Sequence, residues 1–122
     1  MNATPASVLV IESHPLLREA LCAAISDEPD LRVSMEATNG AEALQMLSVI
    51  LPDIILFALD TPGSDELNAL KTLRQSLPET PILALTSDEV PGQEQTALEA
   101  GAFAVLTKAA SRAELISKLR EF

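Results

Sequence analysis

The stretch VLVIESHPLLREAL, residues 8–21, decides the fold because its hydrophobic pattern changes period within a few residues. The run 8–11 is wholly apolar and rich in β-branched side chains, which is typical of a short buried strand. After Pro15, apolar residues recur at helical spacing from Leu16 to Leu21. The stretch therefore predicts one strand followed directly by one helix.

The same change of period recurs along the rest of the chain. Apolar, strand-like runs cover 31–36, 54–59, 82–85 and 102–106, and helical stripes follow over 43–51, 67–77, about 93–100 and from about 113 onward. Strands joined by helices pair in parallel, so these five βα units predict an α/β fold. We expect a three-layer α/β/α sandwich with one five-stranded parallel sheet, flavodoxin-like and doubly wound.

Strand position in this sheet can also be predicted. Only the run 31–36 alternates apolar and polar residues, as expected of an edge strand, whereas the other four runs read as strands buried on both faces. The helix boundaries carry capping signals: Asn39 with Glu42, and Ser111 with Glu114, have the spacing of a capping box. Gly101 stands where a helix would end in the left-handed conformation.

Composition limits the class of protein. The chain has 122 residues, 48% of them hydrophobic, which suits a single domain over 1–122 and excludes intrinsic disorder. Its net charge of −10 argues against unaided binding to nucleic acid, because phosphate contacts need clustered Lys and Arg. We find no apolar run near the roughly 20 residues of a membrane span and no secretory signal, so a cytoplasmic location is expected. Cys22, the single cysteine, is expected to pack rather than react.

Polar residues gather after the predicted strands. They occupy 12–14 after the first strand, 60–63 after the third, 86–89 after the fourth and 107–108 after the fifth. Because the carboxyl ends of parallel strands meet at one edge of a sheet, a functional crevice is expected there. His14 is expected to start a helix rather than to bind metal or act as a base, since nothing nearby has metal-ligand spacing.

The chain resembles the receiver domain of two-component response regulators in four segments that occur in the same order: VLVIESHPLLREAL (8–21), PDIILFALDTPGSDELNALKTLR (52–74), PILALTSDE (81–89) and GAFAVLTKAASRAEL (101–115). The resemblance covers nearly the whole chain. Its opening is most similar to receivers that precede a helix-turn-helix DNA-binding output domain. The resemblance therefore implies protein partners and a fused output domain outside this chain, which would be the N-terminal part of a longer regulator.

The resemblance also implies roles for individual residues. In that family an acidic pair after the first strand and a phospho-accepting aspartate at the end of the third hold Mg²⁺, while a Ser or Thr and a Lys contact the phosphoryl group. Thr86 and Lys108 match, and Glu12 retains one acid, but Ser13 replaces the other and Ala58 stands at the acceptor position. A methyl group cannot act as the nucleophile. We therefore expect no catalytic residue, no enzyme activity and no cofactor, with weak Mg²⁺ binding at most through Glu12.

Two further positions bear on this site. Val105 stands where the family has an aromatic switch residue, so the switch lacks its moving ring. Asp60 lies two residues beyond Ala58, roughly 6–7 Å along a strand, and is expected to be a turn residue rather than a substitute acceptor. Lys108 is expected to pair with Glu12 or Asp60 across the crevice.

Two functions of different classes remain open. The favoured one is an atypical, phosphorylation-independent receiver that acts in signal transduction by protein–protein interaction or dimerisation to control an output domain. The alternative is a conventional phosphorelay receiver, phosphorylated on Asp and dependent on Mg²⁺, whose acceptor was lost by engineering or is replaced by Asp60. The second loss, at Ser13, argues against a single engineered change at Ala58.

Charged residues offer a surface for such contacts. Receivers commonly dimerise through the fourth helix, fifth strand and fifth helix, a region that here carries Glu94, Glu99, Lys108, Arg112, Glu114, Lys118 and Arg120. An ordinary solvated face is the alternative, because exposed ion pairs contribute little. The acidic residues Asp27, Glu28 and Asp30 are expected to form a solvated loop.

Overall fold

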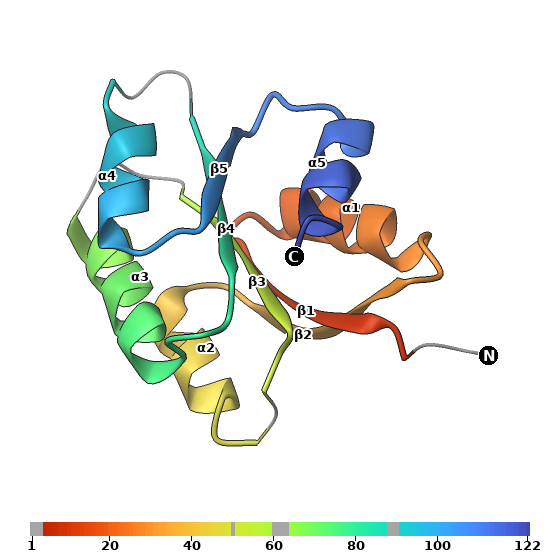
Figure 1. Ribbon diagram of the computed structural model, residues 1–122, viewed down its shortest axis with the longest axis horizontal. Helices are drawn as coiled ribbons and strands as arrows, with labels where there is room; N and C mark the ends of the chain where they lie inside the picture. Colours follow the sequence, from red (N-terminus) through yellow and green to blue (C-terminus); the bar gives the residue numbers. More distant parts are fainter. Residues whose placement is uncertain (1–3, 50, 60–63, 88–90) are drawn as a thin grey trace.

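The computed structural model describes residues 4–49, 51–59, 64–87 and 91–122, which form one parallel sheet with helices on both faces (Figure 1). The strands are β1 (Ala6–Ile11), β2 (Leu31–Ala37), β3 (Ile54–Ala58), β4 (Ile82–Thr86) and β5 (Ala104–Thr107). The helices are α1 (Pro15–Ser26), α2 (Gly40–Met46), α3 (Ser64–Ser76), α4 (Gln93–Ala100) and α5 (Arg112–Leu119). The predicted alternation of strands and helices is confirmed.

The order of the strands places the crevice. Across the sheet it is β2-β1-β3-β4-β5, and every neighbouring pair is parallel. The chain leaves β1 toward one edge and then returns to build the sheet in the other direction from β3. This reversal is the switch point of a flavodoxin-like, doubly wound fold, and it opens a crevice at the carboxyl ends of β1 and β3. The predicted fold class is therefore confirmed.

Two apolar layers cover the two faces of the sheet, because successive strand residues point to opposite sides. Leu9 and Phe57 face α2, α3 and α4, within a cluster that includes Leu70 and Leu73. Val10 and the neighbouring strand residues Leu56, Ala58, Leu83 and Leu85 face α1 and α5, which contribute Leu21, Ile25, Leu115, Ile116 and Leu119. Figure 1 shows α1 and α5 together on one side of the sheet and the other three helices on the opposite side.

The prediction for the edge strands is half right. β2 lies at one edge and alternates in burial, as expected. The prediction that the fifth strand is buried on both faces is wrong, because β5 is the other edge and is half-buried throughout. Helices can cover both faces of an edge strand while its backbone edge stays open, so an apolar run does not distinguish the two cases. The strand also begins at Ala104 rather than at residue 102.

The second helix is shorter than the apolar stripe predicted. α2 ends at Met46, and the chain then turns with Ser48 N–H donating to the Gln45 carbonyl (3.4 Å) and Val49 N–H to that of Met46 (3.0 Å). These tighter bonds to the third preceding residue end a helix. Val49 and Leu51 are consequently exposed rather than packed on the sheet.

Helix caps follow the sequence signals, with one difference. Ser111 and Glu114 form a complete capping box at the start of α5. At α2, the Asn39 side chain accepts from the Glu42 N–H (2.8 Å), but the Glu42 carboxylate returns to the Thr38 N–H (3.0 Å) rather than to Asn39. The start of the helix is thus fixed from one residue further upstream.

Among the described helices, none is long and apolar enough to cross a membrane.

Candidate functional site

The site is organised around Glu12, a carboxylate whose side chain has no solvent exposure. It directly follows β1, and its N–H donates to the Ala37 carbonyl at the end of β2 (3.0 Å). Its own carbonyl accepts from Nη1 of Arg18 on α1 (2.8 Å). Backbone bonds on both sides therefore fix the residue that projects into the crevice.

Two kinds of donor compensate this buried charge. Lys108 Nζ lies 3.4 Å from Glu12 Oε1, and the His14 N–H donates to Oε2 at 3.0 Å. Ser13 Oγ lies 3.5 Å from the same Oε2, at the limit of a hydrogen bond. Burying a carboxylate is tolerated only with such partners. The prediction that Lys108 pairs with Glu12 or Asp60 is confirmed for Glu12, while Asp60 lies outside the described residues.

Lys108 is brought to this position by the sheet. Its N–H donates to the carbonyl of Thr86 at 2.8 Å, which ties the end of β5 to the end of β4. Thr86 is buried, at 3% exposure. Glu12, Thr86 and Lys108 thus stand at the carboxyl ends of β1, β4 and β5, as predicted, at one edge of the sheet.

Ala58 ends β3 between these groups in the strand order and is 1% exposed. Its methyl group belongs to the apolar layer under α1 and α5. The next residue, Leu59, is also buried and donates its N–H to the Leu85 carbonyl (2.8 Å). The position that the resemblance assigns to the acceptor is therefore part of the core, with no carboxylate.

Val105 pairs with Ala84 in the sheet and is half-buried against the layer under α2, α3 and α4. His14 stands at the N-cap of α1 and has extended backbone geometry, as predicted for a residue that starts a helix. Its side chain is 70% exposed, although Nδ1 comes within 3.5 Å of Glu12 Oε2. The predicted turn at 60–63 and residues 88 and 89 lie outside the described residues.

The sequence prediction missed a polar contact next to this site. Gln93, the first residue of α4, is 7% exposed, and its Oε1 accepts from the Ser87 N–H at 2.7 Å. A side-chain amide thereby joins the segment after β4 to the start of α4. The available signal was a glutamine at the first turn of a helix, where its carbonyl oxygen can accept from a backbone N–H.

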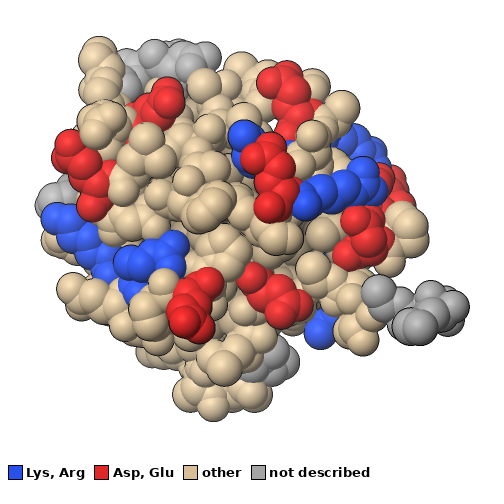
Figure 2. All heavy atoms as spheres, in the orientation of Figure 1, with Lys and Arg blue, Asp and Glu red and all other residues tan. Residues whose placement is uncertain are grey.

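The predicted acidic loop is exposed at Asp27 and Asp30, as expected, but the prediction missed its ion pairs with α5. Arg120 donates from Nε to Asp30 Oδ2 (2.9 Å) and from Nη2 to Asp30 Oδ1 (3.0 Å), and it also contacts Glu28. Arg112 pairs with Asp27. Acidic and basic side chains adjoin over α1 and α5 in Figure 2. The hydrogen bond from Arg120 lowers the pKa of Asp30 below its ordinary value.

These ion pairs leave fewer basic residues on α5 for contacts with another copy. Arg112 and Arg120, which the sequence assigned to a face for pairing between copies, are used within the chain to hold α5 against the segment between α1 and β2.

Cys22 is half-buried on α1, and burial, together with nearby Glu36, raises the pKa of its thiol to about 11. The thiolate is therefore scarce at neutral pH, which agrees with a packing role.

Comparison with known proteins identifies the scaffold. The sequence profile of the response regulator receiver domain matches residues 8–120. The chain belongs to this family. The receiver domain is 33% identical over 113 residues to the transcriptional regulatory protein LiaR of Bacillus subtilis, covering 93% of this chain and 54% of LiaR. It is 32% identical over 120 residues to the nitrate/nitrite response regulator protein NarL of Escherichia coli, covering 98% of this chain and 56% of NarL.

A solved structure agrees with the sequence comparison. The signal receiver domain of NarL from Mycobacterium tuberculosis superposes with a TM-score of 0.86 at 29% identity, covering 98% of this chain and 96% of that domain. The receiver domain described here spans about half the length of the curated relatives it matches. It is thus similar over nearly its whole length to one part of two-component response regulators.

Proposed function

We propose that this receiver domain works without aspartyl phosphorylation and acts through protein–protein contacts that control an output domain. The observation that carries the proposal is Ala58, a buried methyl group at the end of β3 where an acyl phosphate would need a carboxylate. Its role is then that of a binding module in signal transduction rather than a phosphotransfer catalyst. LiaR and NarL, which are nearly twice its length, support the view that an output domain lies outside this chain.

The residues at the crevice do not fit a magnesium site. Mg²⁺ in such sites relies on carboxylate charge and near-ideal geometry. Glu12 is the one carboxylate at the three positions where the family holds the metal, and its two oxygens are contacted by Lys108 and the His14 N–H. Ser13 and Ala58 stand at the other two ligand positions. We therefore propose that Mg²⁺ binds much more weakly here than in receivers with three carboxylates.

The ion pair supports a single resting conformation. A receiver that is switched by a phosphoryl group needs its lysine to contact that group. In this chain the Lys108 ammonium is held by a carboxylate of the protein itself. The pair forms without any ligand, so it stabilises the conformation that contains it. A ligand would shift this equilibrium only by making different contacts in the two states.

Contacts with another copy remain part of the proposal, with a smaller set of residues. Receivers commonly use the face of α4, β5 and α5. On it, Glu94, Glu99 and Glu114 are exposed, and Lys118 is half-buried beside Glu121 (3.2 Å). With Arg112 and Arg120 engaged toward α1, this face is more acidic than the sequence alone indicates. Two copies would therefore have to pair through apolar contacts on this face. A different protein that binds there would have to be basic.

Treatment with acetyl phosphate and Mg²⁺, followed by intact-mass spectrometry, tests the proposal. We expect no phosphoryl adduct on the wild type. The variant Ala58→Asp with Ser13→Asp, which restores two carboxylates, is the matched positive control. A stable phosphoryl adduct on the wild type that disappears in Asp60→Asn would overturn the proposal and establish the conventional alternative with Asp60 as acceptor.

A further inference from the structure

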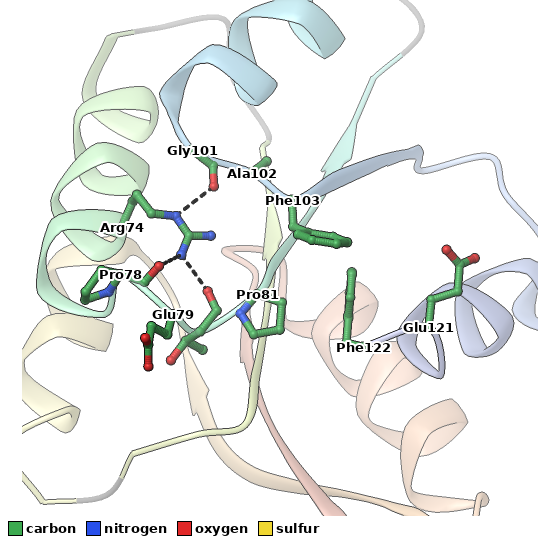
Figure 3. Close-up of a pocket in the computed structure, with 10 residues that line it drawn as sticks. Arg74, Pro78, Glu79, Pro81, Gly101, Ala102, Phe103, Glu121 and Phe122 are labelled. Carbon is green, nitrogen blue, oxygen red and sulfur yellow. Dashed lines mark hydrogen bonds between the residues drawn. The ribbon is translucent and has the colours of Figure 1, made fainter.

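A second concave surface lies at the opposite end of the sheet from Glu12, before the strands begin. It is a hollow of about 450 Å³ between the turn that precedes β4, the turn that precedes β5 and the end of α5 (Figure 3). The crevice described above contributes none of its lining residues. The hollow is therefore a separate surface with its own chemistry.

Two phenyl rings form one wall of this hollow. Phe103 is 64% exposed, and its ring meets that of Phe122 edge to face, with centroids 4.9 Å apart and planes at 85°. Of the chain's three phenylalanines, the remaining one, Phe57, is fully buried in the core. An exposed phenyl face attracts cations through its quadrupole as well as apolar groups. The rings therefore offer a surface for both kinds of group.

Arg74 makes the opposite wall rigid. Its Nε donates to the Gly101 carbonyl (2.9 Å), and its Nη1 donates to the carbonyls of Leu77 (3.1 Å), Pro78 (3.1 Å) and Thr80 (2.8 Å). Several of these acceptors lie just past the C-terminus of α3, where a helix dipole is negative. The guanidinium charge is therefore directed at the backbone, and the wall is held in place without a carboxylate.

Carboxylates stand at the two sides of the hollow. Glu79 is exposed, and no lysine or arginine nitrogen of the described residues lies within ion-pair distance of it. Glu121 lies beside the phenyl rings in Figure 3 and pairs with Lys118 at the surface (3.2 Å). The chain as a whole carries a net charge of −10. Aromatic faces next to carboxylates on an acidic protein are complementary to a basic group with an apolar stem.

We propose that this hollow binds a basic segment of a protein partner, with an arginine or lysine side chain lying on the Phe103 ring and pairing with Glu121 or Glu79. The aliphatic stem of that side chain contacts the rings, and its charge replaces or joins Lys118 at Glu121. This docking surface does not involve Glu12, Ala58 or Lys108. Its test is therefore independent of whether the domain is phosphorylated.

A short peptide is a suitable probe because the chain contains neither Trp nor Tyr. The peptide acetyl-Ser-Arg-Trp-Arg-Ser-amide carries two positive charges and a fluorophore. We expect saturable binding by tryptophan fluorescence, with amide NMR shifts concentrated at 101–103 and 121–122. A matched peptide with Glu in place of both Arg residues is expected not to bind.

Variants distinguish this surface from general attraction to an acidic protein. Phe103→Ala and the pair Glu79→Gln with Glu121→Gln should each weaken peptide binding by about 5-fold or more, because they remove the ring or the charges. Glu94→Gln on α4, an exposed position outside the hollow, should leave it unchanged. All of these positions are exposed, so the variants should fold. The absence of binding, shifts spread over the whole acidic surface, or equal loss in Glu94→Gln would each overturn the proposal.

Discussion

At the scale of single residues, the substitution of a methyl group for a carboxylate at position 58 changes what its neighbours can do. Lys108 contacts Glu12, which is fully buried and accepts from the His14 N–H as well. Glu12, the acidic residue retained at the site, therefore neutralises Lys108, the basic residue retained there. Removing either partner leaves a charge in a place from which water is largely excluded.

Lys108→Ala should lower the free energy of unfolding at neutral pH by about 1–3 kcal/mol, below the range for fully buried pairs because the lysine is 23% exposed. Urea denaturation at neutral pH measures this loss.

The matched control for this prediction is Lys118→Ala, which breaks a surface pair with Glu121 and should cost little at any pH. In a double-mutant cycle, Lys108→Ala should cost less in a Glu12→Gln background than in the wild type. Equal unfolding midpoints for Lys108→Ala and the wild type at neutral pH would show that the contact adds no stability.

Restoring the two missing carboxylates is a separate prediction at this scale. Ala58→Asp with Ser13→Asp should recover binding of beryllofluoride in the presence of Mg²⁺, because Thr86 and Lys108 already stand at the same edge of the sheet. Ala58→Asn with Ser13→Asn is the uncharged control and should not bind. Titration followed by NMR measures the recovery, and no binding by the Asp variant would mean that the crevice differs at more than these two positions.

At the scale of elements, α2 and α3 are held together by a close approach at Gly40. A methyl group added there would lie 2.3 Å from the Cβ of Ala69. Gly40→Ala should therefore destabilise the protein by about 1–3 kcal/mol, although Ala is ordinarily the better helix residue.

The compensating variant tests the cause of that loss. Gly40→Ala with Ala69→Gly removes the overlap, so it should recover stability apart from about 1 kcal/mol for a glycine within α3. Thermal or urea unfolding of the wild type, Gly40→Ala and the double variant is the measurement. If Ala69→Gly brings no recovery, the close approach does not explain the cost.

The contact of α5 with the segment before β2 should depend on pH. Arg120 lowers the pKa of Asp30 in the folded state, so the pair stabilises the fold above the unfolded pKa of about 3.9 and loses this effect as the pH falls through the lower folded value. The difference in free energy of unfolding between wild type and Arg120→Met should accordingly be largest near neutral pH and should disappear in acid.

Arg32→Met is the control for that experiment, since it removes an exposed arginine that forms no ion pair within the described residues. Added salt should also narrow the difference for Arg120→Met, because these side chains are exposed and screened. A difference that stays constant from neutral to acid pH would exclude the Asp30 pair as its source.

The elements that could be predicted are those with local signals. Capping residues such as Ser111 and the change of hydrophobic period located the helices and strands because both depend on neighbours in the sequence. The ion pairs of Arg120 join residues about 90 positions apart, and nothing in the local sequence indicates them. The edge position of β5 was missed for the same reason: it depends on which strands pair, not on which residues are apolar.

At the scale of the whole molecule, the two ends of the sheet differ in chemistry. The carboxyl end holds Glu12 and Lys108, and the other end holds the exposed Phe103 beside Phe122. Communication from the first end to the α4–β5 surface depends in the family on an aromatic residue where this chain has Val105. Val105 is half-buried against the layer under α2, α3 and α4 and has no ring to rotate.

Beryllofluoride bound to the variant with Ala58→Asp and Ser13→Asp should consequently shift NMR signals near the crevice and leave those of α4 and β5 largely unchanged. The same variant carrying Val105→Tyr in addition is the comparison that tests the missing ring. Large shifts over α4 and β5 with Val105 intact would mean that the signal travels by another route.

The order β2-β1-β3-β4-β5 also has a consequence for the chain as it leaves the ribosome. After β3, each newly synthesised strand pairs with the one made just before it, so β4 and β5 are added at a single edge in the order of translation. Apart from the outer edge of β2, the nascent domain therefore exposes one growing edge at a time, which limits the opportunity for pairing with other chains. The arginines of α5 then contact residues 27–30, so the final helix of the receiver fold pairs with a segment from the first third of the domain.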